Sequence, residues 1–69
     1  MSERDEAFYR KLSCITQTCA VRPLVMVVAD EEVVISLHGK PLITYSSEGY
    51  QRLTAYEISE QLEKIGSNL

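Results

Sequence analysis

The residues of this chain that could act as nucleophiles, bases or metal ligands are two cysteines, one histidine and a run of acids. Cys14 and Cys19 are five residues apart in a predicted helix, about 140° around its axis, so they cannot readily form a disulfide with each other within that helix. A nucleophilic cysteine needs a base within reach. The single histidine, His38, lies in a predicted turn, and no sequence motif joins it to either thiol. We therefore expect no catalytic residues and no enzymatic activity.

Metal and cofactor sites need spacings that the chain does not show. The cysteines and His38 lack the spacing of a zinc site, and Gly39 and Lys40 lack the spacing of a P-loop. The acids at positions 30–32 are consecutive and join two apolar runs. This arrangement predicts a solvated turn whose charge discourages aggregation of strand edges, with a weak divalent-cation site as the alternative. We expect no metal and no cofactor.

A first helix is expected from Ser2 or Glu3 to about Cys19, because Ser2 and Asp5 have the spacing of a capping box. Apolar residues at steps of 4, 3 and 4 form one face of this helix: Phe8, Leu12, Ile15 and Cys19. Cys19 should therefore be a small core residue, whereas Cys14 lies off the face and should be the exposed thiol. Reduced thiols, a charged N-terminal segment and apolar runs far shorter than about 18 residues indicate a cytoplasmic protein without a membrane span.

Three strands should follow, at 24–29, 33–37 and 41–45. The first two are rich in valine and are joined by the acidic turn, which predicts a hairpin. His38 and Gly39 then supply a tight turn, and Pro41 can open the third strand only at the edge of a sheet. Residues 46–49 are expected to form a loop.

The second helix is expected at 55–65. Thr54 and Glu57 have the spacing of a capping box, and Leu53 with Ile58 has the spacing of a hydrophobic staple. Gly66 is placed to cap the C-terminus. The 69 residues then form a single α+β domain of order αβββα, with two helices packed on one face of a three-stranded antiparallel meander.

The first strand, LVMVVA, has no polar residue, although a strand with one face in water should alternate. We expect Leu24, Met26 and Val28 to face the helices, because they are bulkier overall. The other set, Val25 and Val27, would then face outward near Val34. Since exposed apolar patches mark association sites, these three valines are candidate residues for contact with another protein or with a second copy in a homodimer.

Three of the four tyrosines occur in the last third of the chain, and tyrosine combines a large apolar area with a polar tip, which suits interfaces. Tyr45, Tyr50 and Tyr56 are therefore further candidate interface residues. The alternative is that each tyrosine lies at the edge of the core with its hydroxyl in water.

The stretch GYQRLTAYEISEQLEK leads into the last predicted helix and contains most of it. The order αβββα resembles that of the double-stranded-RNA-binding domain in topology. That resemblance implies a lysine cluster at the start of the last helix, which grips phosphates. Here the stretch has Arg52 and then the acids Glu57 and Glu60, and the net charge is −3. Nucleic acid is therefore an unfavoured partner, and a nucleic-acid-binding module is the alternative function.

The leading hypothesis is a small, non-enzymatic regulatory or adaptor protein that acts through protein–protein contact. A chain of this size and acidic charge is also typical of phage- or plasmid-borne inhibitors of a bacterial enzyme or complex. That extension is an analogy from size and charge.

Overall fold

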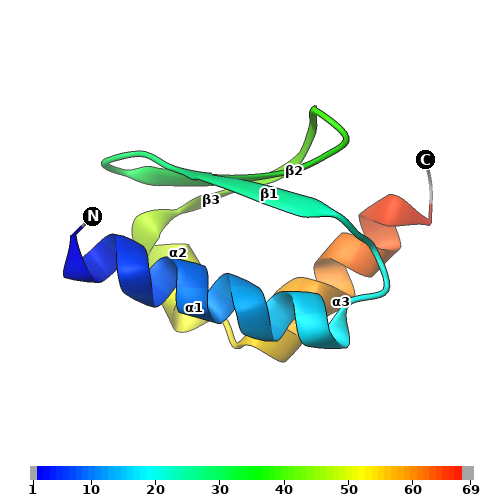
Figure 1. Cartoon of the computed structure of the whole chain (residues 1–69), viewed down its shortest axis with the longest axis horizontal. Coiled ribbons are helices and arrows are strands. Elements are labelled where there is room, and N and C mark those ends of the chain that lie inside the picture. The colour runs from blue at the N-terminus through cyan, green and yellow to red at the C-terminus, as the bar shows by residue number, and fades with distance from the viewer. Residues whose placement is uncertain (1, 68–69) are drawn as a thin grey trace.

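In the computed structural model, which describes residues 2–67, one antiparallel sheet lies over a layer of helices (Figure 1). The elements follow in the order α1 (Glu3–Thr18), β1 (Leu24–Val28), β2 (Glu32–Leu37), β3 (Lys40–Ser46), α2 (Ser47–Arg52) and α3 (Ala55–Gly66). The strands are hydrogen-bonded in sequence order, so β2 is central and β1 and β3 are the edges. The expected α+β fold with a three-stranded meander is confirmed, and the helix layer contains three helices where two were expected.

Helix α1 begins as the sequence predicts. The Ser2 hydroxyl accepts a hydrogen bond from the backbone N–H of Asp5 at 3.2 Å, which satisfies one of the donors that a helix leaves free at its start. Phe8, Ile15 and Cys19 are buried, because the apolar face of the helix packs beneath the sheet.

A tight turn holds β2 and β3 in register. His38 and Gly39 connect β2 to β3 with φ values of 52° and 79°, the left-handed geometry that a two-residue hairpin requires. Strand β3 carries Pro41 near its start and a register shift opposite Ile35 and Ser36. An edge strand tolerates both features, which agrees with the predicted edge position of this strand.

Residues 46–49 do not form the expected loop. The Ser46 hydroxyl accepts from the Gly49 backbone N–H at 3.0 Å and caps α2, whose Tyr50 is fully buried. The small polar residues that indicate a loop are here a helix cap and a first turn. A helix of six residues is not stable alone, so the burial of Tyr50 stabilises it.

Helix α3 has both hydrogen bonds of the predicted capping box between Thr54 and Glu57. It runs one residue beyond the expected end and includes Gly66. A Cβ at Gly66 would lie 2.6 Å from Cγ2 of Val21, so this glycine allows a close approach of two segments and is not the residue beyond the helix end that we expected.

The core lies between the inner face of the sheet and the helices. Its buried hydrophobic residues come from five of the six elements and from the cap of α1: Phe8, Ile15, Cys19, Met26, Val33, Ile35, Tyr50, Ile58 and Leu62. Strand β3 adds Leu42, Ile43 and Tyr45, which are partly buried against them.

Candidate interaction surface

The face of the sheet that points away from the helices, here called the outer face, is formed by Val25, Val27, Val34, Ser36 and Thr44. The strand register places Val27, Val34 and Thr44 in one row and Val25 beside Ser36 in the next. Val25 and Val27 are 56% and 57% exposed, and Val34, with a neighbour on each side, is half-buried.

The predicted orientation of β1 is therefore confirmed. Met26 is only 4% exposed, and Leu24 and Val28 are partly buried and pack against the core. None of the elements within residues 2–67 lies above the outer face (Figure 1). Strand β1 is apolar on both sides, but residues 2–67 cover only one of its sides.

The outer face carries almost no charge. Glu32 is the one charged residue at the outward positions of the three strands, where it pairs with Ser46 at the end of the sheet. From ordinary strand spacings the face measures roughly 14 by 17 Å, on the order of 240 Å². A standard protein interface buries about 800 Å² on each partner, so a stable contact would have to include neighbouring surface.

Tyr50 is not on a surface, and the expectation that it belongs to an interface is wrong. Its side chain is 0% exposed, its hydroxyl donates to the Phe8 carbonyl at 2.8 Å, and the two rings lie 4.8 Å apart. Burial, with smaller contributions from the nearby Cys14 and Tyr45, raises the pKa of Tyr50 to about 12. Helix α2, which the sequence did not predict, turns this side chain into the core.

The other two candidate tyrosines do not join the valines. Tyr45 pairs with the buried Val33, so it lies on the helix side of the sheet, where its hydroxyl donates to Oε1 of Gln61 and burial raises its pKa. Tyr56 is 64% exposed on α3 in the helix layer, and its hydrogen bond to Glu60 raises its pKa. The candidate residues therefore divide into three outer valines, two inward tyrosines and one tyrosine on another surface.

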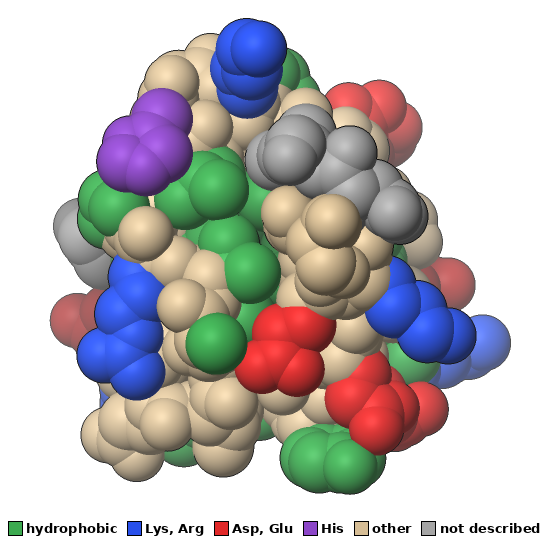
Figure 2. All heavy atoms as spheres, turned by 90° about the vertical axis from the view of Figure 1, so that its right-hand side faces the viewer, with side chains coloured by type: hydrophobic (Ala, Val, Ile, Leu, Met, Phe, Trp, Pro, Cys, Tyr) green, Lys and Arg blue, Asp and Glu red, His purple; other side chains and the backbone are tan. Residues whose placement is uncertain are grey.

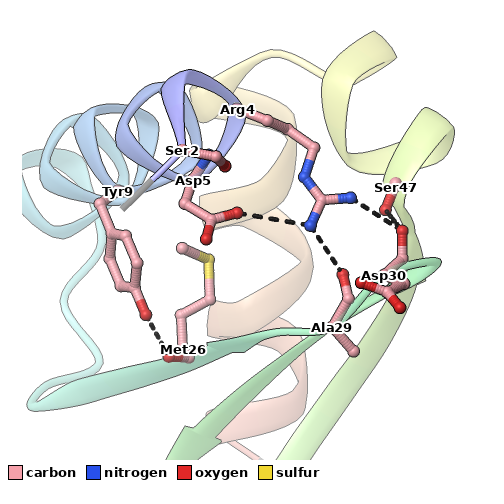
Figure 3. A network of polar contacts seen from close by, with 8 residues as sticks. All are labelled: Ser2, Arg4, Asp5, Tyr9, Met26, Ala29, Asp30 and Ser47. Carbon is pink, nitrogen blue, oxygen red and sulfur yellow. Dashed lines mark hydrogen bonds and ion pairs between the residues drawn. The ribbon is translucent and has the colours of Figure 1, made fainter.

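A polar network that sequence reasoning missed joins α1 to the end of β1 (Figure 3). The Tyr9 hydroxyl donates to the Met26 carbonyl at 3.3 Å. The Arg4 guanidinium donates to the carbonyls of Asp30 and Ala29 at 2.8 and 3.2 Å. These contacts link residues 17 to 26 positions apart, and no local signal in the sequence points to them.

The acidic turn is held through its backbone. Besides the bonds from Arg4, the Glu31 carbonyl accepts from the Ser47 backbone N–H at 3.0 Å, which joins the turn to the start of α2. Across the described part of the chain, no three His, Cys, Asp or Glu side chains come together as possible metal ligands.

The thiols lie where the sequence predicts. Cys14 is exposed and Cys19 is buried, with its Sγ 3.8 Å from the Ser59 carbonyl. His38 is exposed in the turn between β2 and β3.

Charge of both signs occurs at the end of the molecule where α3 ends. Figure 2 looks onto the end of the molecule where α3 ends, and it shows acidic and basic side chains on either side of a narrow hydrophobic strip. At the start of α3, Glu57 takes part in the capping box and Arg52 ends α2. A lysine cluster like that of the double-stranded-RNA-binding domain does not occur there.

Within residues 2–67, none of the helices is long and apolar enough to cross a membrane. Comparison with protein-family models, with curated proteins and with solved structures found no match to the chain.

Proposed function

We propose that this chain is a small regulatory or adaptor protein, without enzymatic activity of its own, that binds another protein through the outer face. One observation carries the proposal: Val25 and Val27 are each more than half exposed on the edge strand of a face that carries almost no charge, while the opposite face is covered by three helices. Full burial of a valine side chain contributes about 1.5–3 kcal/mol, so a partner that covers this face gains a few kcal/mol.

The charge of the chain supports a protein partner over a nucleic acid. Binding to a phosphate backbone depends on clustered Lys and Arg, whereas this chain has ten acids against seven bases. More specifically, the small size and acidic charge of the chain suit a phage- or plasmid-type inhibitor of a bacterial enzyme or complex.

The test compares capture by wild-type protein with capture by two matched variants. Val27→Ser removes apolar area from the outer face, and Tyr56→Ser removes a residue of similar exposure from the helix layer. Bacterial lysate is passed over each immobilised protein, retained proteins are identified by mass spectrometry, and the binding of the purified partner is measured by calorimetry.

We expect one stoichiometric partner that binds the wild type and Tyr56→Ser with equal affinity and binds Val27→Ser at least tenfold more weakly. Equal binding by all three proteins would refute the assignment of the outer face. Retained nucleic acid that nuclease removes would favour the nucleic-acid-binding alternative.

A further inference from the structure

Within residues 2–67, no strand pairs with the outer edge of β1. In an antiparallel pair, alternate residues direct their N–H and C=O groups toward the partner strand. The Ala29 N–H donates to the Glu32 carbonyl at 2.8 Å, so residues 25, 27 and 29 face β2, and residues 24, 26 and 28 face away from it. The hydrogen bond from Tyr9 to the Met26 carbonyl agrees, because a carbonyl that faces away from β2 is open to a donor on α1.

The two edges of the sheet differ in how they are protected. Strand β3 carries Lys40, Pro41 and a register shift, and both α2 and α3 pack against it. These are features that discourage the addition of another strand. Helix α1 packs against β1 as well, but the strand itself lacks the other features: its sequence is LVMVV, without charge, proline or irregular pairing.

We propose that β1 pairs antiparallel with β1 of a second copy, about a two-fold axis at Met26, so that six strands form one sheet. In this register Met26 lies opposite Met26 of the other copy, and Leu24 lies opposite Val28. All three residues direct their N–H and C=O groups away from β2, so each pair can exchange two backbone hydrogen bonds. The Tyr9 hydroxyl comes from the helix side of the sheet (Figure 3) and can stay in place, because a carbonyl oxygen has two lone pairs.

The side chains match in the same register. Val25 of one copy lies opposite Val27 of the other on the outer face, as directly facing β-branched residues, which stabilise a pair of strands. Leu24, Met26 and Val28 of both copies stay on the helix side. A shift by one residue would place the groups that already bond β2 against the new strand. A shift by two would leave Leu24 or Val28 without a partner in β1, so the register centred on Met26 is the one that pairs all three residues.

The flank that would meet the second copy is of adequate size. Figure 1 looks onto this flank, with β1 and α1 nearest the viewer. The molecule measures 33 × 21 × 18 Å and is viewed along its shortest axis, so the whole outline of this flank encloses at most about 700 Å². Each partner of a standard interface buries roughly 800 Å², so the contact must extend from β1 over α1.

Charge along α1 is compatible with the two-fold arrangement. The flank of α1 has an open hollow with mostly carbon walls, lined by Glu6, Tyr9, Arg10 and Ser13. Tyr9 lies level with Met26 and hence with the axis. Glu6 precedes Tyr9 and would therefore lie near the residues that follow Tyr9 in the other copy. On this flank those residues are Arg10 and Ser13, so no acid would face an acid.

The dimer extends the proposed function. The use of the joined outer faces to bind another protein rests on that function, whereas the formation of the dimer does not. Joining two sheets at β1 brings the valines of both outer faces side by side and doubles an area that is too small alone. The dimer itself is tested without any partner.

The test uses register-specific disulfide formation. In a Cys14→Ser background, Val25→Cys and Val27→Cys proteins are mixed at 100 µM and oxidised with diamide. Directly opposite residues of this kind have Cα atoms about 4.5 Å apart, within the range of a disulfide, whereas two copies of position 25 are diagonal neighbours at about 7–8 Å. We expect a covalent dimer in the mixture and at least tenfold less in either protein alone.

Sedimentation equilibrium of the wild-type protein from 10 µM to 1 mM provides the second measurement, and it does not depend on the variants folding. A mass of twice 7.8 kDa at the upper concentrations is expected, and a monomer throughout would overturn the proposal. Equal cross-linking of Val25→Cys alone would show a different pairing and would overturn it as well. A monomer that still captures a partner would refute the dimer only, and a cross-linked dimer without a partner would refute the proposed function only.

Discussion

The orientation of β1 predicts very different costs for truncating two adjacent residues. Met26 is 4% exposed in the core, and truncating a buried methionine to alanine costs about 2–5 kcal/mol, since a cavity remains. Val27→Ala removes two methyl groups that are 57% exposed. At about 0.8 kcal/mol for a fully buried group, the covered fraction corresponds to roughly 0.7 kcal/mol.

The assay is urea denaturation followed by circular dichroism, at about 5 µM so that self-association does not contribute. A domain of this length has about 3–10 kcal/mol of stability, so Met26→Ala should lower the midpoint strongly or leave the chain unfolded, whereas Val27→Ala should shift it slightly. Equal costs at the two positions, or a larger cost at Val27, would refute the facing of the strand. Because a slip of one residue exchanges the two sides of a strand, Met26 and Val27 cannot both face the core.

Three further predictions concern single sites. Thr54→Ala removes the cap of α3 and should lower the free energy of unfolding by about 0.5–2 kcal/mol; an unchanged denaturation midpoint would contradict the capping geometry. Cys14 is exposed and Cys19 is buried, so a thiol reagent should label Cys14 first in the native protein, and equal labelling rates would show that α1 is rotated. Because the pKa of Tyr50 is raised to about 12, its protonated form is favoured in the native state, and its contribution to stability is complete below pH 10 and lost as the pH rises from 10 to 12. Tyr50→Phe should be less stable by about 1 kcal/mol at pH 8 and should show a smaller decrease in unfolding free energy between pH 10 and 12; parallel pH profiles for the two proteins would refute the buried phenol.

Helix α3 could be predicted closely because its signals are local. The capping box between Thr54 and Glu57 involves residues three positions apart, and the buried residues Ile58 and Leu62 follow at helical spacing. The start of α1 is predictable for the same reason, since Ser2 caps a backbone N–H three residues away. Such interactions are present in the sequence before any tertiary contact forms.

Helix α2 could not be predicted because its stability is tertiary. The sequence SEGYQR has a glycine at its third position and is too short for a helical periodicity. What stabilises it lies on α1: the Phe8 ring and carbonyl contact Tyr50, and the Lys11 ammonium donates to the Tyr50 carbonyl near the C-terminus of α2. Burial also lowers the pKa of Lys11, although its charge is favourable at the end of a helix. Because α2 was not predicted, Tyr50 was wrongly expected at the surface.

The orientation of β1 was predictable from the relative bulk of its two sets of side chains, but the contacts along its edge were not. Tyr9 reaches Met26 and Arg4 reaches Ala29 only because α1 lies along β1 after folding. The sequence shows a tyrosine and an arginine on the polar side of a helix, and that pattern usually indicates solvated side chains.

The two edges of one small sheet show why the apolar residues of β1 have two separate roles. Met26 and its inward neighbours are required by the core, and any foldable sequence would need similar residues there. Val25 and Val27 are not required in this way, because threonine or lysine at these exposed positions would leave the core intact and would protect the edge. Strand β3 shows that arrangement, with Lys40 and Pro41 at its start and Thr44 on its outer face. The same chain therefore protects one edge and leaves the other apolar, and this contrast favours β1 and the adjoining outer face as the surface by which the protein makes contact.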